Sequence, residues 1–303
     1  MVTPSLVALI VSAAVMMASA CFSAAEDLDT LKARHVLLIV LENEDFSKVV
    51  EDPYFDKLRT RGKWFSNSQA ITHPSYPNYL ALVAGDTFGV KNDHLKDFHD
   101  PDPKKYATIA DLLEAKHLTW KSYAQGYPGS STKCDTVDDE SKTRYARKHV
   151  PLLSFKAITT TARCRNVVDA NTEFDPYVQK NRLAELKAKL PNFAFYTPDM
   201  DNHGQNTSLK RASQWLESIL DPLLNDTEFM RDVLIVVTFD ESATHHAVED
   251  GHIFTVMLGP MLKPGEDKTR INHYTVLRTI ESIFTLPQMT ENDRREIPIP
   301  INW

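Results

Sequence analysis

A serine at the start of a predicted helix is the first candidate for chemistry in this sequence. Ser75 is followed by Pro77 and by an apolar run that ends at Gly85. Proline suits the first turn of a helix because its missing N–H would have no partner there, so Ser75 is expected beside free backbone amide groups. Such groups attract phosphate. The pattern therefore predicts either a nucleophile beside a bound phosphate or a serine that only caps the helix.

Polar side chains follow three runs that have the composition of β-strands. These side chains are Glu42 and Asn43, Asp199 and His203, and Asp240 and Glu241. Each group alone is compatible with an ordinary turn, because Asn and Asp favour turns. In an open α/β sheet, however, the carboxyl ends of the strands meet along one edge, which is where ligands bind. We therefore expect these side chains to gather at one site.

Carboxylates that gather at one site repel one another unless they are protonated or share a cation. Oxygen ligands accompanied by one or two histidines suit Mg, Ca, Mn or Zn. A metal ion at this edge of the sheet would stabilise the alkoxide of Ser75 and would polarise a phosphoryl group. The sequence thus predicts a divalent metal site beside Ser75.

The segments that would position these residues alternate between strands and helices. Residues 35–41, 233–239 and 253–259 are apolar runs typical of strands that are buried on both faces of a sheet. Shorter strands are predicted at 64–68, 119–123 and 193–196, and helices at 52–61, 108–117, 183–190, 213–224 and 274–284. The alternation predicts an α/β fold. Because no linker or internal repeat interrupts it, residues 26–303 are predicted to form a single catalytic domain.

Residues 125–171 are a long polar excursion from this alternation, rich in Gly, Pro, Ser, Thr and charges. Cys134 and Cys164 lie within it, and neither stands in a metal-ligand or redox spacing. In an oxidising compartment such a pair favours a disulfide that closes the excursion. Residues 145–149 are basic; they form either a solvated charged surface or a segment that reaches an anionic substrate.

Residues 1–25 have the features of a secretory signal. Positions 6–18 are apolar but too few to span a bilayer comfortably, and small residues follow. We expect cleavage after Ala25, secretion, and no stable membrane anchor. Asn206 and Asn225 begin glycosylation sequons, which fits secretion by a eukaryote. Asn225 is the better acceptor, because a glycan on Asn206 would crowd His203.

The charge of the chain argues against nucleic-acid binding. The formal net charge is −7, and no charged residue precedes Glu26, so removal of the signal leaves this charge unchanged. Nucleic-acid-binding proteins instead carry a basic surface. We therefore expect no nucleic-acid partner.

Taken together, the motifs resemble a family of phosphoesterases that contains secreted fungal acid phosphatases and bacterial phospholipases C. The resemblance extends from about residue 35 to residue 284 and is carried by residues 42–43, 73–79 with Gly85, 120–123, 145–149, 198–199 with His203, 240–241 and 251–252. The family is related to the alkaline phosphatase superfamily. The resemblance implies a three-layer α/β/α sandwich with a mostly parallel central sheet, and a phosphoric ester hydrolase.

The resemblance also implies roles for individual residues. Nucleotide pyrophosphatase/phosphodiesterases are more distantly similar, and their nucleophile precedes an aromatic-Pro-Asn sequence, as Ser75 does here. The similarity implies a phosphate-oxygen donor at Asn92, and metal or phosphate ligands at Asp199, His203 and His252. Those two-zinc enzymes have Asp-His after the late strand and Asp after the first. This chain differs at both places, so we expect one divalent ion (Zn, Mg, Ca or Mn) held by Glu42, Asn43, Asp240 and Glu241.

The predicted reaction is an in-line attack by Ser75 on a small phosphate monoester, followed by hydrolysis of the phosphoserine. Asn92 and His203 would stabilise the oxyanion, and His252 or Asp199 would protonate the leaving group. A phosphodiesterase or phospholipase C-type enzyme would use the same nucleophile. A further alternative is a secreted protein that binds phosphate or metal without catalysing a reaction. Such a protein would not need the Ser75 hydroxyl.

Overall fold

A computed structural model of the chain describes residues 32–98, 100, 102–130, 132–137, 144–244 and 251–301. The predicted secretory signal, residues 1–25, lies outside the described residues. In the described part of the chain, no helix combines the length and the apolar composition needed to cross a membrane.

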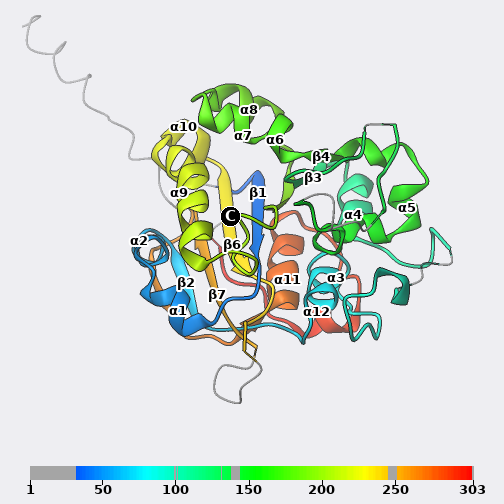
Figure 1. Cartoon of the computed structure of the whole chain (residues 1–303), viewed down its shortest axis with the longest axis horizontal. Helices are drawn as coiled ribbons and strands as arrows, with labels where there is room; N and C mark the ends of the chain where they lie inside the picture. The colour runs from blue at the N-terminus through cyan, green and yellow to red at the C-terminus, as the bar shows by residue number, and fades with distance from the viewer. Residues whose placement is uncertain are drawn as a thin grey trace, which may run out of the picture.

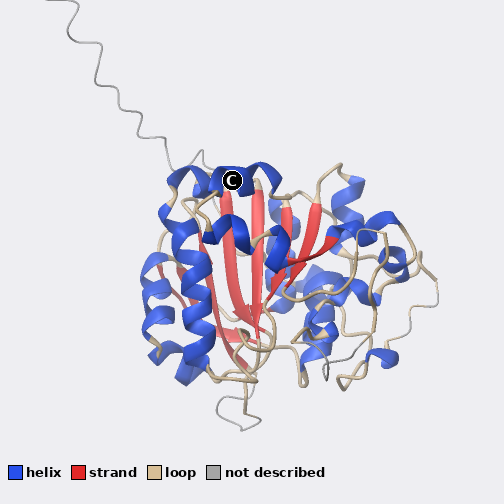
Figure 2. Ribbon diagram, turned by 45° about the horizontal axis from the view of Figure 1, so that its top comes forward, coloured by secondary structure: helices blue, strands red, loops and turns tan. Residues whose placement is uncertain are grey.

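A mixed β-sheet forms the centre of the molecule (Figure 2). Its strands are β1 (His35–Leu41), β2 (Lys63–Gln69), β3 (Trp120–Ala124), β4 (Val167–Asp169), β5 (Phe193–Thr197), β6 (Val233–Phe239), β7 (His252–Leu258), β8 (Gly265–Asp267) and β9 (Ile271–Asn272). They lie in the order β4, β3, β5, β1, β6, β7, β2, β8, and β9 also pairs with β2. The longer predicted strands are therefore confirmed to within one or two residues.

The sheet is mostly parallel, as predicted, but β7 runs antiparallel to both of its neighbours, β6 and β2. β7 follows β6 through a connection that contains no helix among its described residues. Parallel neighbours require a long crossover, whereas a direct return places the next strand antiparallel. The composition of residues 253–259 predicted the strand but carried no information about its direction.

Helices cover both faces of the sheet (Figures 1 and 2). They are α1 (Phe46–Glu51), α2 (Pro53–Arg61), α3 (Ser75–Ala84), α4 (Ile109–Ala115), α5 (Lys156–Thr159), α6 (Ala170–Glu173), α7 (Asp175–Gln179), α8 (Leu183–Lys189), α9 (Leu209–Asn225), α10 (Thr227–Met230), α11 (His273–Ile283) and α12 (Glu291–Arg295), with 3₁₀ turns η2 (Leu95–Asp97), η3 (Arg147–His149), η4 (Pro151–Ser154) and η5 (Ala162–Asn166). Helix α9 begins four residues before its predicted start because the Ser208 side chain caps it by accepting the Arg211 N–H.

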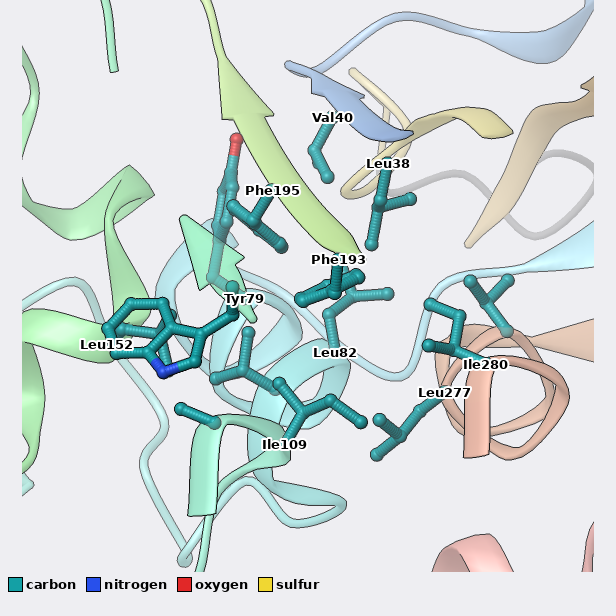
Figure 3. Packing of buried hydrophobic residues seen from close by; sticks show 14 of the residues in the cluster. Leu38, Val40, Tyr79, Leu82, Ile109, Leu152, Phe193, Phe195, Leu277 and Ile280 are labelled. Atoms are coloured by element: carbon teal, nitrogen blue, oxygen red, sulfur yellow. The ribbon is translucent and has the colours of Figure 1, made fainter. Parts of the chain in front are cut away.

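Two hydrophobic clusters, one on each face of the sheet, explain the three layers. Alternate residues of β1 enter different clusters: Val36, Leu38 and Val40 on one face, and Leu37, Ile39 and Leu41 on the other. The first cluster includes residues of α3, α4 and α11, part of which Figure 3 shows, and the second includes residues of α2, α9 and α10. A run of apolar residues without polar alternation thus indicates a strand whose two faces are both covered by helices.

The polar excursion at 125–171 folds back onto the first cluster. Leu152 and Phe155 are buried within it, although the segment as a whole is rich in polar residues. A disulfide joins Cys134 to Cys164, as predicted, with their Cα atoms 5.0 Å apart. The segment is therefore an extension of the single core.

Helix α3, which begins with Ser75, is buried along its whole length. It ends at Gly85, whose φ of 69° is the left-handed conformation that favours glycine at this position. The hydroxyl of Thr290 and the amide of Asn292 both donate to the Gly85 carbonyl, at 2.7 and 3.0 Å. These contacts attach the far end of α3 to the segment that carries α12.

A pair of buried carboxyl groups, Glu281 on α11 and Asp293 on α12, lies beside this attachment. Asp293 accepts the backbone N–H groups of Met289 and Thr290, both at 2.7 Å. Burial, together with the hydrogen bond and the charge of Asp293, raises the pKa of Glu281 to about 9, although the Arg278 guanidinium opposes the shift. Glu281 therefore carries a proton in the folded chain at neutral pH.

We expect Glu281 to make the protein less stable as the pH rises. The unfolded chain releases the Glu281 proton near pH 4.5 and the folded chain near pH 9, so the folded state binds one more proton between these values. The free energy of unfolding then falls over this window, by at most about 1.4 kcal/mol per pH unit. In urea unfolding at pH 5 and pH 8, Glu281→Gln should reduce this loss, whereas the exposed Glu228→Gln should not. Equal pH dependence in all three proteins would contradict the assignment.

Candidate active site

The side chain of Ser75 reaches two acids and does not cap its helix. Ser75 is the first residue of α3, the N-cap position is Pro74, and no side-chain capping bond forms there. The Ser75 Oγ lies 2.5 Å from Glu42 Oε1 and 2.9 Å from Glu241 Oε1. Its one hydroxyl hydrogen can be donated to only one of these oxygens at a time. The structure thus argues against the capping role, and the role of Ser75 as a nucleophile stays a prediction.

Three buried carboxylates meet beside Ser75, at the edge of the sheet where β1 and β6 end. Glu42 follows β1, and Asp240 and Glu241 follow β6, which is the neighbouring strand. One oxygen from each carboxylate lies within 4.8 Å of the others. The Asn43 N–H donates to Asp240 Oδ1 at 3.0 Å. The fold therefore brings together the four residues that we predicted as metal ligands.

The donor set fits a divalent cation. Asp240 Oδ2 is buried and has no hydrogen-bond partner among the described residues. A buried carboxylate oxygen without a partner is costly, and a cation is a usual means of satisfying it. Carboxylate oxygens with an amide nearby are ligands that hard divalent ions accept.

The electrostatics of the cluster agree with this fit. Burial, and then the charges of Glu42 and Glu241, raise the pKa of Asp240 well above its usual range. Burial is also the main cause that raises the pKa of Glu241 to about 8. Burial acts in the same direction on Glu42, but the imidazoles of His149 and His203 outweigh it and lower the pKa of Glu42 to about 2. Without a cation, the three acids therefore cannot all be ionised at neutral pH.

Among the described residues, two histidines outside the predicted site set contact the carboxylate groups of these acids. His149 is buried, its Nε2 lies 2.5 Å from Glu42 Oε2, and its ring stacks on Tyr79 at 4.9 Å. His73 pairs with Glu241 through its Nδ1. The signals were present in the sequence, because His73 immediately precedes Pro74-Ser75 and His149 belongs to the basic run 145–149. That run is therefore not simply a solvated surface, since His149 turns inward from it.

His203 reaches the cluster on a tight turn after β5. Its carbonyl oxygen accepts the Glu42 N–H at 2.9 Å, and its ring meets His149 edge-on at 5.5 Å. The neighbouring Gly204 has a φ of 121°, and a Cβ there would lie 2.9 Å from the Glu42 carbonyl oxygen. Glycine at this position therefore permits the close approach of the two backbones.

Asp199 shapes that same turn. Its carboxylate accepts the N–H groups of Asp201 and Asn202 at 3.0 and 3.1 Å, and its carbonyl accepts the N–H of His203 at 3.0 Å. These contacts hold His203 in place. They give Asp199 a local structural role that the resemblance did not imply, and its predicted role as a proton donor stays a prediction.

The described contacts do not bring Asn92 and His252 to the Ser75 cluster. The Asn92 amide donates to Asp97 at 2.5 Å, and its oxygen accepts the His94 N–H at 2.7 Å. The ring of His252 stacks on Phe46 at 3.8 Å, and its Nε2 lies 3.1 Å from the Ser66 carbonyl oxygen. Both side chains thus interact with nearby partners. Residue type and spacing in the sequence do not reveal which partners these are.

Asp93, the residue after Asn92, is the one that faces Ser75. Its Oδ1 accepts the Tyr76 N–H at 3.0 Å, and its Oδ2 accepts Lys148 Nζ at 2.8 Å. A cavity of about 410 Å³ opens here, lined by Asn43, Glu44, Pro74, Ser75, Asp93, Gln205, Glu241 and Ala243. It is large enough for a small phosphate ester.

The two predicted glycosylation sites lie at different distances from this site. Asn225 is exposed at the end of α9, where its Oδ1 accepts an N–H of Arg61 at 3.1 Å. Asn206 is also exposed, and it lies three positions after His203 in the chain. Our expectation that a glycan on Asn206 would crowd His203 is consistent with this placement, and glycosylation itself stays a prediction.

Two proteins that are named as phosphatases are similar to this chain along most of its length. An acid phosphatase of Aspergillus fumigatus is 32% identical over 275 residues, which are 88% of this chain and 58% of that protein. A phosphatidylinositol-3-phosphatase of Mycobacterium tuberculosis is 31% identical over 262 residues, which are 84% of this chain and 78% of that protein. The chain spans about three fifths of the length of the fungal acid phosphatases it matches.

The fold has a counterpart among solved structures. A protein in the alkaline phosphatase superfamily from Vibrio parahaemolyticus aligns with a TM-score of 0.61 and 15% identity, covering 90% of this chain and 72% of that one. The predicted alkaline-phosphatase-like α/β fold is therefore confirmed. The model of the phosphoesterase family matches residues 61–287. With a match of this length, and with relatives at this level of identity, the chain belongs to the phosphoesterase family.

Proposed function

We propose that this chain is a secreted, metal-dependent acid phosphatase that hydrolyses small phosphate monoesters through a phosphoserine at Ser75. The observation that carries the proposal is the position of Ser75 Oγ, at the start of a buried helix and between the carboxylates of Glu42 and Glu241. The similar proteins named acid phosphatase and phosphatidylinositol-3-phosphatase support a monoester substrate. The Cys134–Cys164 disulfide supports an oxidising compartment.

The proposed metal site consists of Glu42, Asn43, Asp240 and Glu241. One divalent ion held there would act as a Lewis acid on a phosphoryl oxygen and would favour the Ser75 alkoxide. The buried Asp240 Oδ2, which lacks a hydrogen-bond partner among the described residues, supports this ligand set. The identity of the ion is among Zn, Mg, Ca and Mn.

In the proposed reaction, Ser75 transfers its hydroxyl hydrogen to one of the two carboxylates it contacts and attacks phosphorus in line with the ester oxygen. The Oγ–P bond forms as the P–O bond to the leaving group breaks, and the leaving oxygen takes up a proton. Among the described residues, Glu44 and Asp93 are the acids in the cavity wall besides Glu241. Burial raises the pKa of Glu44 to about 7, so we propose Glu44 as the acid that protonates the leaving group in place of His252, with Asp199 as the alternative first predicted. Water then hydrolyses the phosphoserine.

The proposal is tested by comparing two substrates. Purified protein supplied with divalent metal should hydrolyse a simple aryl phosphate faster than the corresponding bis-aryl diester. Acid quenching during turnover should leave phosphate on the peptide that contains Ser75, detectable by mass spectrometry. Faster hydrolysis of the diester would instead indicate a phosphodiesterase, and binding of metal and phosphate without turnover would indicate a non-catalytic protein.

His149 offers a further prediction within this function. His149→Phe keeps the ring that stacks on Tyr79 but removes the contact with Glu42, so we expect kcat/KM to fall roughly 10- to 100-fold, as for other partners of metal ligands. His252→Phe keeps the stack on Phe46 and is the matched control, with an expected loss below about threefold. A larger loss for His252→Phe than for His149→Phe would restore the catalytic role first predicted for His252.

A further inference from the structure

His273, the first residue of α11, makes a contact that the sequence did not indicate. The side chain is fully buried, and its Nε2 lies 2.6 Å from the backbone carbonyl oxygen of Asp240. A carbonyl oxygen only accepts hydrogen bonds, so Nε2 carries the hydrogen and donates it. His273 Nδ1 is buried without a hydrogen-bond partner among the described residues. Among the described residues, the hydrogen bond to Asp240 is thus the only one that this imidazole makes.

The carbonyl that His273 holds is half of the peptide unit between Asp240 and Glu241. Because a peptide unit is planar, fixing its C=O also fixes the direction of the Glu241 N–H. That N–H donates to Asp240 Oδ1 at 2.7 Å. His273 therefore acts on the Asp240 carboxylate through the backbone, without touching the carboxylate itself.

The remaining contacts of Asp240 leave one carboxylate oxygen open. The Asp240 N–H donates to the Leu41 carbonyl at 3.0 Å, which holds the other side of the residue. Oδ1 accepts the Asn43 N–H at 3.0 Å in addition to the Glu241 N–H. Oδ2, by contrast, is buried and has no partner among the described residues. Together with the hydrogen bond from His273, these contacts orient the carboxylate so that Oδ2 is the oxygen available to a cation.

Helix α11 holds His273 in a fixed position. Asn272 caps the helix: its Oδ1 accepts the Thr275 N–H and its own N–H donates to the Thr275 hydroxyl, both at 3.0 Å. α11 also packs against α3, the helix that begins with Ser75; Figure 3 shows its Leu277 and Ile280 in the same hydrophobic cluster as Leu82 of α3. One helix therefore supports both the nucleophile and Asp240.

We propose that His273 is a positioning residue, which holds the Asp240–Glu241 peptide so that Asp240 Oδ2 is oriented for a divalent cation. This inference rests on the proposed metal-binding role of Asp240. It assigns a function to the histidine that begins α11.

The experiment compares two substitutions of His273 that differ in one hydrogen bond. His273→Gln can place an amide N–H where the Nε2–H lies, whereas His273→Asn is too short to do so. Mn²⁺ is titrated into metal-free protein and binding is followed by calorimetry. We expect His273→Asn to bind Mn²⁺ roughly 10- to 100-fold more weakly than the wild type, and His273→Gln to stay within about threefold of it.

Ile280→Val is the matched control, because it weakens the packing of a buried residue on the same helix without reaching the site. It should lower the melting temperature and leave the affinity for Mn²⁺ unchanged. If His273→Asn behaves like Ile280→Val, the histidine is only structural and the inference is overturned. Failure of the wild-type protein to bind Mn²⁺ would instead overturn the metal-binding role of Asp240, and the inference with it.

Discussion

Ser75→Ala is expected to lower kcat by at least about a thousandfold, which is a modest loss for removal of a nucleophile. The Oγ is the only reactive atom that the substitution removes, and alanine is compatible with the first turn of α3. Without Oγ, a phosphate ester bound in the cavity has no covalent route to hydrolysis. Steady-state kinetics on an aryl phosphate measure this loss, and circular dichroism tests whether the fold is intact.

Ser213→Ala provides the control for Ser75→Ala. Ser213 is also a buried serine near the start of a helix, but its hydroxyl donates to the Lys210 carbonyl on α9, away from the acids. We expect this variant to keep its activity within about twofold of the wild type. If Ser75→Ala retained comparable turnover, the phosphoserine mechanism would be excluded and a directly activated water would have to replace it.

Asp240→Asn is expected to separate stability from activity. The substitution keeps an oxygen that can accept the N–H groups of Asn43 and Glu241, but it removes one of three buried ionisable carboxyl groups. Metal affinity should fall by more than the roughly 10- to 100-fold that loss of a ligand's partner costs, and activity should fall with it. The metal-free protein should become more stable, because burial and like charges oppose ionisation of Asp240.

Thermal unfolding with and without added metal tests this prediction. In the wild type, a cation that binds only the folded state should raise the melting temperature. In Asp240→Asn, the metal-free melting temperature should exceed that of the wild type, and metal should add little to it. A variant that is less stable without metal and is still stabilised by metal would argue against Asp240 as a ligand.

The sequence by itself determined the layers of the fold and the edge at which the acids meet. Strands β1 and β6 match their predicted ranges because their runs are apolar at nearly every position, a pattern typical of strands that are covered on both faces. The acids follow those strands directly in the chain. Parallel neighbouring strands that end in acids bring them to one edge, so Glu42, Asp240 and Glu241 could be placed together without coordinates.

Only the tertiary structure decided which way individual side chains turn. Asn92 binds Asp97 while its neighbour Asp93 faces Ser75, and His149 turns inward from a basic run to reach Glu42. His273 holds Asp240, from which it is separated by 33 positions in the chain. Such choices depend on partners that the fold supplies from distant segments. Residue type and spacing constrain the local backbone, but they carry little information about those partners.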